Sequence, residues 1–178
     1  MPTRRSDAAR SRGRILEAAR ERPVTDLRLN ELARAADVGV ATVYRHFPTV
    51  AALVEALTLH ALEQLVEQAR TAAAMPESAD AFALLVRTTA IQQLDHQGLQ
   101  TILLSDEVSD AVRTLREELF GLAEATLEDA IRDGVVRPEM TVGHIQRLVC
   151  GVEHAVRLGD GHDRELLLDV MLSGLSPR

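Results

Sequence analysis

The fold of this chain is decided by one short stretch, Leu29-Asn-Glu-Leu-Ala-Arg-Ala-Ala-Asp-Val-Gly-Val-Ala-Thr-Val-Tyr-Arg-His-Phe-Pro48. Its first half places apolar residues at positions 29, 32, 33 and 36, the spacing of one face of a helix. Asp37-Val38-Gly39 interrupts that pattern, and Gly39 can supply either the backbone angles of a tight turn or a permissive N-cap. A second short helix follows over 40–47 and ends at Pro48. Two short helices joined by a tight turn are typical of a helix-turn-helix.

The second of these helices has two different sides. Val40, Val43 and Phe47 share one side, which is predicted to seat the helix against its predecessor. The opposite side is polar or small and consists of Ala41, Thr42, Arg45 and His46, with Tyr44 at the border.

The polar side has the chemistry needed to contact double-stranded DNA. Small residues at 41 and 42 let a helix enter a major groove about 12 Å wide. Arg45 can donate two hydrogen bonds to guanine, while the side chains at 42, 44 and 46 suit phosphate oxygens. The predicted DNA-binding residues are Arg28, Gly39, Val40, Ala41, Thr42, Tyr44, Arg45 and His46.

Charge is distributed unevenly along the chain. The 178 residues carry a net charge of −7, which by itself argues against a nucleic-acid partner. Residues 1–47 nevertheless hold ten Arg and six acidic residues, so this part is positive and the remainder strongly acidic. Arginines in such a segment add attraction to phosphates that is independent of base sequence and weakened by salt. The asymmetry indicates an anion-binding head on an acidic body.

The rest of the chain continues with helical periodicity and shows no strand-like alternation of useful length. Aromatic residues make up only 2% of the sequence, so the core must come mainly from Leu, Val, Ile and Ala, which favours closely packed helices. We therefore predict an all-α fold of about nine helices, at 7–21, 29–36, 40–47, 49–73, 78–95, 99–104, 106–133, 142–158 and 164–175.

Composition also argues against several other classes of protein. The apolar runs are far shorter than a membrane span, and the arginine-rich start lacks the apolar stretch of a signal peptide. The single cysteine, Cys150, cannot form an internal disulfide, so a reducing, cytoplasmic setting is predicted. No histidine follows a Glu by three residues, and no nucleophile elbow, phosphate loop or HExxH string occurs. We therefore expect no enzyme, no cofactor, no metal site and no membrane partner.

Four strings of residues closely resemble the N-terminal domain of TetR-type transcriptional regulators. They are Ile15-Leu-Glu-Ala-Ala19, Leu32-Ala-Arg-Ala-Ala-Asp-Val38, Thr42-Val-Tyr-Arg-His-Phe-Pro48 and Ala52-Leu-Val-Glu-Ala-Leu57. The resemblance covers about residues 13–60, and its Thr-x-Tyr-x-His-Phe core is highly specific. It implies a three-helix DNA-binding head, a connecting fourth helix and a C-terminal domain that usually binds a small effector. It also implies backbone contacts from Thr42, Tyr44 and His46, with Val40, Ala41 and Arg45 nearest the bases.

On this resemblance, residues 1–48 are predicted to form the DNA-binding domain and residues 49–178 the effector-binding and dimerisation domain. The expected function is that of a homodimeric repressor released from a near-palindromic DNA operator by a small-molecule effector. The alternative is a helical dimeric interaction protein with a vestigial head. Two departures from the family pattern keep this alternative open. The stretch between Ala19 and Leu32 is shorter than in the family, which predicts a truncated first helix, and Val50 replaces the usual Lys or Arg.

Two further sets of residues are predicted from the body of the chain. Cys150 and His154 lie one helical turn apart, but no further metal ligand stands at a suitable spacing. The candidate effector-pocket residues are His60, Gln64, Gln93, His96, Cys150 and His154. The last two helices carry more apolar residues than one small domain needs to bury, so they are predicted to build a four-helix interface between two copies. Its candidate residues are Ile145, Leu148, Val149, Val152, Val156, Leu167, Val170 and Met171.

Overall fold

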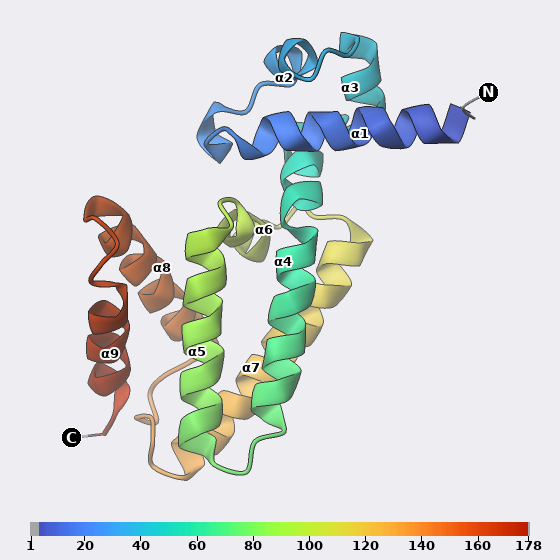
Figure 1. The fold of residues 1–178 in the computed structure, drawn as a ribbon. Coiled ribbons are helices and arrows are strands. Elements are labelled where there is room, and N and C mark those ends of the chain that lie inside the picture. The colour runs from blue at the N-terminus through green and yellow to red at the C-terminus, as the bar shows by residue number, and fades with distance from the viewer. Residues whose placement is uncertain (1–3, 178) are drawn as a thin grey trace. The chain divides into compact units, whose positions relative to one another are not determined.

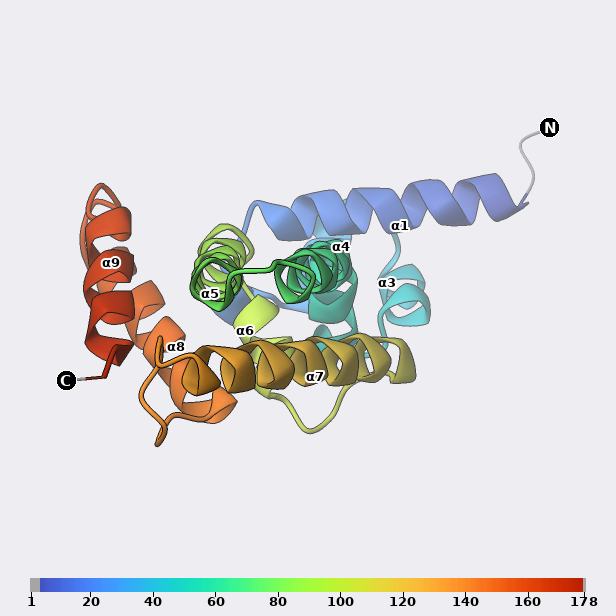
Figure 2. The same cartoon turned by 90° about the horizontal axis from the view of Figure 1, so that it is seen from below.

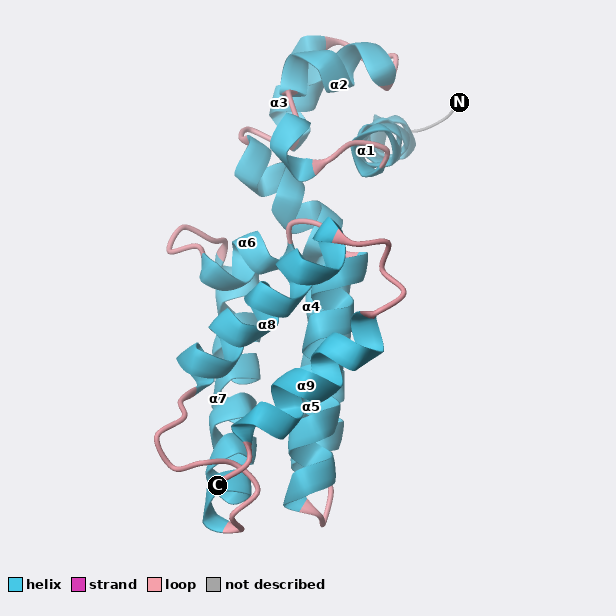
Figure 3. Cartoon of the chain, turned by 90° about the vertical axis from the view of Figure 1, so that its left-hand side faces the viewer, coloured by secondary structure: helices cyan, strands magenta, loops and turns pink. Residues whose placement is uncertain are grey.

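The computed structural model describes residues 4–177, with side chains from residue 7 onward. The first three residues of the predicted 1–48 domain and the side chains of Arg4 and Arg5 therefore lie outside the description. Within the described residues every regular element is helical (Figure 3). The elements are α1 (Arg4–Arg20), the short 3-10 helix η1 (Val24–Asp26), α2 (Leu29–Ala35), α3 (Val40–His46), α4 (Val50–Ala73), α5 (Ser78–Asp95), α6 (Leu99–Leu104), α7 (Asp110–Arg132), α8 (Val142–Leu158) and α9 (Arg164–Leu175).

The all-α prediction is confirmed, and α6, α8 and α9 have the predicted bounds. The clearest difference is the start of α7, which begins at Asp110 rather than at 106. Ser105 and Glu107 explain the delay, because the Ser105 hydroxyl accepts a hydrogen bond from the Glu107 amide at 3.2 Å. Such a local bond offers the backbone an alternative to the helix. The 3-10 helix η1 was not predicted, since three residues are too few to show a period.

The turn of the helix-turn-helix is a left-handed cap on Asp37. This residue has φ 50°, and its amide bonds to the Arg34 carbonyl at 3.2 Å. The next amide, that of Val38, bonds to the Ala33 carbonyl at 2.9 Å, which completes a Schellman motif. Gly39 has ordinary extended angles, φ −66° and ψ 142°, and acts as the N-cap of α3. Of the two roles considered for Gly39, the N-cap role is confirmed. The residue with the unusual, left-handed backbone angles of the turn is Asp37.

The described chain divides into two compact units. Unit 1 extends to His60 and includes Gln97–Val112, while unit 2 comprises Ala61–His96 and the residues from Arg113 onward. Helices α4 and α7 therefore contribute to both units. The predicted functional boundary after residue 48 stays a prediction, but the compact unit that holds the helix-turn-helix extends beyond it.

In unit 1, α1 packs against both α2 and α3, and α2 packs against α3 (Figure 1). The side chains between them are fully buried, with exposed fractions of 2% or less for Ile15, Leu32, Val43 and Phe47. The Arg12 guanidinium carbon lies 5.3 Å from the centre of the Phe47 ring, within cation–π range. A small aliphatic core with one aromatic ring therefore fixes α3.

In unit 2, α8 packs against both α5 and α9 (Figures 1 and 2). An ion pair also ties α5 to α9, because Arg87 bonds to Glu165 at 3.1 Å and to Asp169. The core of this unit is aliphatic apart from one phenylalanine, and it comprises Phe82, Val86, Ala90, Leu127, Ala130, Val136, Ile145, Val149, Leu168, Met171 and Leu175.

Among the described residues, no single helix has both the length and the apolar character to cross a membrane. Helices α3 and α4 satisfy that test only when taken together, and they are bent by 59° where they meet.

Gly98, the N-cap of α6, gives a testable prediction for unit 1. It has φ +98°, and an added Cβ would lie 2.8 Å from Val54 Cγ1 and 3.3 Å from Val24 Cγ2. Gly161 is a matched control, because it has φ +80° but nothing within 4 Å of an added Cβ. Gly161→Ala should cost about 1–2 kcal/mol of backbone strain. Gly98→Ala should cost about 1–3 kcal/mol more through overpacking, measured by urea unfolding. Equal losses in the two variants would contradict the packing described here.

Candidate nucleic-acid interface and ligand cavity

Helix α3 is held by one side and exposed on the other. Val43 and Phe47 are buried, and Ala41 and Arg45 are exposed as predicted. Tyr44, which was predicted at the border, is exposed, and Thr42, which was predicted to point outward, is half-buried. Val40 is a correction, because it was expected to pack against α2 and is instead 46% exposed. As the first residue of α3 it precedes the buried side, which begins one turn later at Val43. Val40 thus joins the exposed side of the helix.

Arg45 and Thr42 lie one turn apart on this exposed side. Arg45 Nη2 donates a hydrogen bond to Thr42 Oγ1 at 3.3 Å, and the contact is open to solvent. A bond of this length between exposed groups contributes little, so the guanidinium can exchange it for a stronger bidentate contact. Arg45 is therefore oriented along α3 while its hydrogen-bond donors remain available.

His46 is only half-buried, so the prediction that it points outward is partly wrong. Its Nε2 atom is buried and has no hydrogen-bond partner, and its ring centre lies 6.3 Å from that of Phe47. Burial lowers the pKa of the imidazole, and the nearby charges of Arg45 and Arg12 lower it further. The neutral ring is favoured, so a phosphate contact from His46 would be a neutral hydrogen bond rather than an ion pair.

Arg28, also predicted to contact DNA, is exposed but engaged. Its Nη1 donates to the backbone carbonyls of Thr25 at 3.1 Å and Leu27 at 3.0 Å. It must release these carbonyls to reach a phosphate. Arg12 was not among the predicted residues, although its place one turn before the buried Ile15 and Leu16 is a signal that could have put it beside α3.

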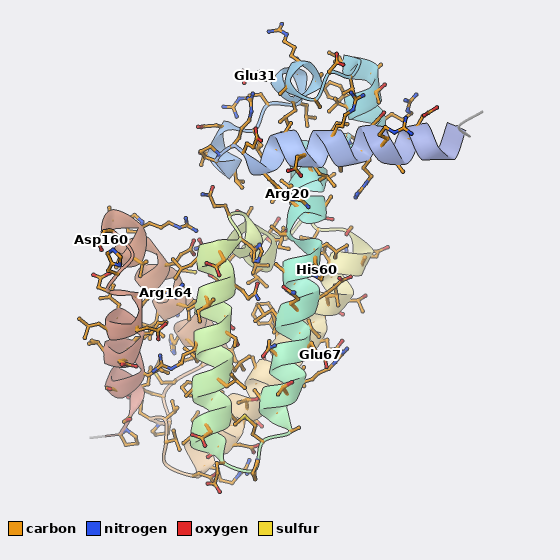
Figure 4. All side chains as sticks on the ribbon, in the orientation of Figure 1. Arg20, Glu31, His60, Glu67, Asp160 and Arg164 are labelled. Atoms are coloured by element: carbon orange, nitrogen blue, oxygen red, sulfur yellow. The ribbon has the colours of Figure 1, made fainter. Side chains whose placement is uncertain are left out.

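The six predicted effector-pocket residues are not brought together. His60, labelled on α4 in Figure 4, is exposed, as are Gln64 and His154, and His96 is half-buried. Gln93 and Cys150 do meet, with Cys150 Sγ 3.9 Å from Gln93 Oε1. Among the described residues, no three His, Cys, Asp or Glu side chains form a group that could hold a metal ion.

A hollow lies instead between α5, α7 and α8 in unit 2. Its volume is about 50 Å³, and its wall is almost entirely apolar. The lining residues are Phe82, Leu85, Val86, Thr89, Leu119, Phe120, Ala123, Leu127, Val142, Ile145, Gln146 and Val149. A water molecule needs roughly 10–15 Å³ of such space, so the hollow has room for a few waters or a very small organic group as it stands. None of the six predicted pocket residues lines it.

The predicted dimer interface divides into two sets. Ile145, Val149, Val156 and Met171 are buried within the single chain, so they are core residues and this part of the prediction is corrected. The sequence could not separate them, because α8 carries apolar residues on two sides. Leu148 and Val170 are 41% and 62% exposed, and Leu166, one turn before Val170 on α9, is 64% exposed. Val152 and Leu167 are half-buried.

The comparisons with known proteins agree with this geometry. Residues 15–57 match the family model of bacterial regulatory proteins of the tetR family. No curated protein sequence matches the chain.

Solved structures resemble the chain over its whole length. A TetR transcription regulatory protein from Mycobacterium vanbaalenii is 29% identical over 97% of this chain and 99% of its own, with a TM-score of 0.50. NalD, the secondary repressor of the MexAB-OprM multidrug efflux pump in Pseudomonas aeruginosa, is 26% identical over 96% and 98%, with a TM-score of 0.59. AibR, in complex with isovaleryl coenzyme A and operator DNA, shares the fold at 17% identity over 94% and 98%, with a TM-score of 0.65.

An all-α chain with an exposed, polar helix-turn-helix belongs to the class of DNA-binding regulators. More particularly, its helix-turn-helix region, residues 15–57, is similar to that of the bacterial regulatory proteins of the tetR family.

The lowered pKa of His46 gives a prediction for the pH dependence of stability. Because the folded state disfavours the charged imidazole, the unfolded chain binds more protons once the pH falls below about 6.5. The contribution of His46 is therefore fully present above that pH and is lost as the pH falls toward the lower pKa of the folded state. Urea unfolding at pH 7.5 and 5.5 should show a smaller acid-induced loss in His46→Gln than in the unchanged protein. Identical losses would argue against the burial of this ring.

Proposed function

We propose that this chain is a repressor that binds a near-palindromic operator as a homodimer and releases it when a small effector occupies unit 2. The observation that carries the proposal is α3, which is anchored by Val43 and Phe47 and presents Tyr44 and Arg45 to solvent. A helix in the major groove can place an arginine against the O6 and N7 acceptors of guanine. The exposed Ala41 leaves room for close approach of the helix to the base edges.

The relatives support the two halves of this proposal. NalD is described as a repressor, and AibR was solved with both operator DNA and an acyl-coenzyme A. A DNA partner also agrees with the predicted cytoplasmic setting, which remains part of the proposal. The alternative of a vestigial head stays open for two reasons. Val50 is not cationic, so it cannot make the phosphate contact of a Lys or Arg, and α1 already ends at Arg20.

The DNA-binding proposal predicts different effects for two neighbouring residues of α3. Duplexes selected from a random library by the unchanged protein should be compared in mobility shifts with Arg45→Ala, Tyr44→Ala and a control, Arg147→Ala, on the exposed surface of α8. Arg45→Ala should lose about 1–3 kcal/mol of preference for the guanine that it contacts. Tyr44→Ala should weaken binding to all sequences about equally. Failure of the unchanged protein to select any sequence would leave the vestigial-head alternative.

The dimer interface is proposed at the exposed side of α8 and α9. On α8, Leu148, Val152 and Ala155 share one side at the spacing i, i+4 and i+7, and on α9 Leu166 and Val170 are one turn apart. Leu166 and Val170 are more than 60% exposed in the single chain. Two such helices from each copy can pack as a four-helix bundle around a two-fold axis.

This interface predicts that a charge placed in its centre separates the two subunits. Leu148→Arg should sediment as a monomer at micromolar concentration, because the interface would have to bury an unpaired guanidinium. His154→Arg adds the same charge on the solvent side of α8 and should remain a dimer. A dimer in both variants would place the interface elsewhere, and a monomeric unchanged protein would contradict dimerisation at this concentration.

Effector control follows from the position of the hollow. A ligand larger than the present hollow of about 50 Å³ can be enclosed by it only if α5, α7 or α8 moves. Helix α8 also carries the proposed dimer interface, so its displacement would alter how two subunits meet. Release then requires only that the ligand favour a dimer whose α3 helices no longer match the repeat of about 34–36 Å between successive major grooves.

A further inference from the structure

A row of polar side chains continues the side of α8 that faces α5. Gln146, Cys150 and Glu153 are spaced i, i+4 and i+7 along α8 and are all buried or half-buried. Gln93 of α5 meets this row and is 1% exposed. Gln146 also belongs to the wall of the apolar hollow, so the row leads away from one end of it.

The contacts within this row are weak. Gln146 Nε2 lies 3.6 Å from Cys150 Sγ, and Cys150 Sγ lies 3.9 Å from Gln93 Oε1. Sulfur is a poor hydrogen-bond donor and acceptor, so these contacts hold the two amides only loosely. A polar group entering from the hollow could replace them at little cost.

Two atoms of the row are buried without any partner. Gln93 Nε2 has no acceptor, and Glu153 Oε2 has no donor. The other oxygen of Glu153 accepts from Arg157 Nε at 3.0 Å, and Arg157 Nη2 donates to the Gln93 backbone carbonyl at 3.2 Å. Arg157 therefore holds the two residues at the same place, where they offer one unused donor and one unused acceptor.

Buried groups of this kind are costly. Each unsatisfied donor or acceptor costs about 1–3 kcal/mol, and native proteins contain few of them. Thr89, which lines the hollow, lies one turn before Gln93 on the same side of α5. The unpaired groups therefore lie about one helical turn beyond the apolar wall, where a bound molecule could satisfy both.

We propose that Gln93 and Glu153 bind the polar end of the effector, whose apolar end occupies the hollow between α5, α7 and α8. The Gln93 amide donates to an acceptor on the ligand, and Glu153 Oε2 accepts from a donor. The ligand class is thus a short aliphatic molecule with an uncharged hydroxyl or primary amide end. A carboxylate end is disfavoured, because it has no hydrogen to donate to Glu153 Oε2, and Arg157 already donates to Glu153 Oε1 and to the Gln93 backbone carbonyl. This proposal rests on the effector-responsive function proposed above and specifies its ligand.

Binding of three probes with the same chain length tests the proposal: hexanamide, 1-hexanol and hexanoate, titrated into the full-length protein by calorimetry. The unchanged protein should bind hexanamide and 1-hexanol more tightly than hexanoate. Gln93→Met should weaken hexanamide binding about two- to tenfold, the value of one hydrogen bond. Gln68→Met, which changes an exposed glutamine of α4, should leave it unaltered. Glu153→Gln should narrow the difference between hexanamide and hexanoate.

The thermal midpoint of the unliganded protein separates ligand binding from a purely structural role of Gln93. If the amide awaits a ligand, Gln93→Met removes an unpaired donor and should hold or raise the midpoint. A lowered midpoint with unchanged hexanamide affinity would overturn the proposal, as would a preference for hexanoate or no binding of either uncharged probe. Selection of DNA without any probe is measured separately. If the protein selects no DNA sequence, the repressor function is refuted. The ligand site would still be supported if hexanamide and 1-hexanol bind more tightly than hexanoate.

Discussion

The seating of α3 through Val43 and Phe47 is the contact on which the proposed activity depends. Burial of two such side chains contributes roughly 3–6 kcal/mol, a large share of the stability of a small helical unit. It also fixes the rotation of α3 about its own axis, so that Tyr44 and Arg45 face away from the core. A seven-residue helix is too short to be stable alone, and its orientation therefore comes from packing.

In unit 2, packing likewise gives α8 a buried side and an exposed side, and the two proposed sites lie on different sides of this helix. Its inner side contributes Ile145 and Val149 to the core, and its outer side leaves Leu148 exposed. Between them runs the polar row that ends at Glu153. A helix that touches the ligand hollow on one side and the proposed partner subunit on the other is a direct physical route for coupling effector binding to dimer geometry. No long chain of intermediate residues is required.

Most helix positions and the exposed side of α3 could be predicted from the sequence. Helix positions follow from periodicity and from Gly or Pro interruptions, which explains why α6, α8 and α9 have the expected bounds. The exposed side of α3 follows from its alternation of apolar and polar residues. Periodicity fails where a helix is apolar on two sides, as the corrected assignment of Ile145 and Met171 shows. Periodicity also says nothing about local caps, so it could not predict that Asp37 adopts the left-handed conformation that ends α2.

The proposed effector site was the least predictable part of the structure. Six polar residues were expected to line it, but the hollow is lined mainly by apolar side chains of α5, α7 and α8. Polar residues attract attention in a sequence, whereas a cavity arises from the misfit of apolar surfaces, which depends on the packing of three helices. Gln93 was among the predicted pocket residues, but its burial and its unpaired Nε2 could be found only from its surroundings.

The most direct test of the central claim is protection of guanine N7 from methylation on duplexes selected by the protein. If α3 enters the major groove from each subunit of a dimer, two groups of guanines should be protected, about one helical turn or 34–36 Å apart on one face of the duplex. Protection at Arg45 contacts should disappear in Arg45→Ala. Unprotected guanines throughout a tightly bound duplex, or protection that persists unchanged in that variant, would contradict the orientation of α3 described here.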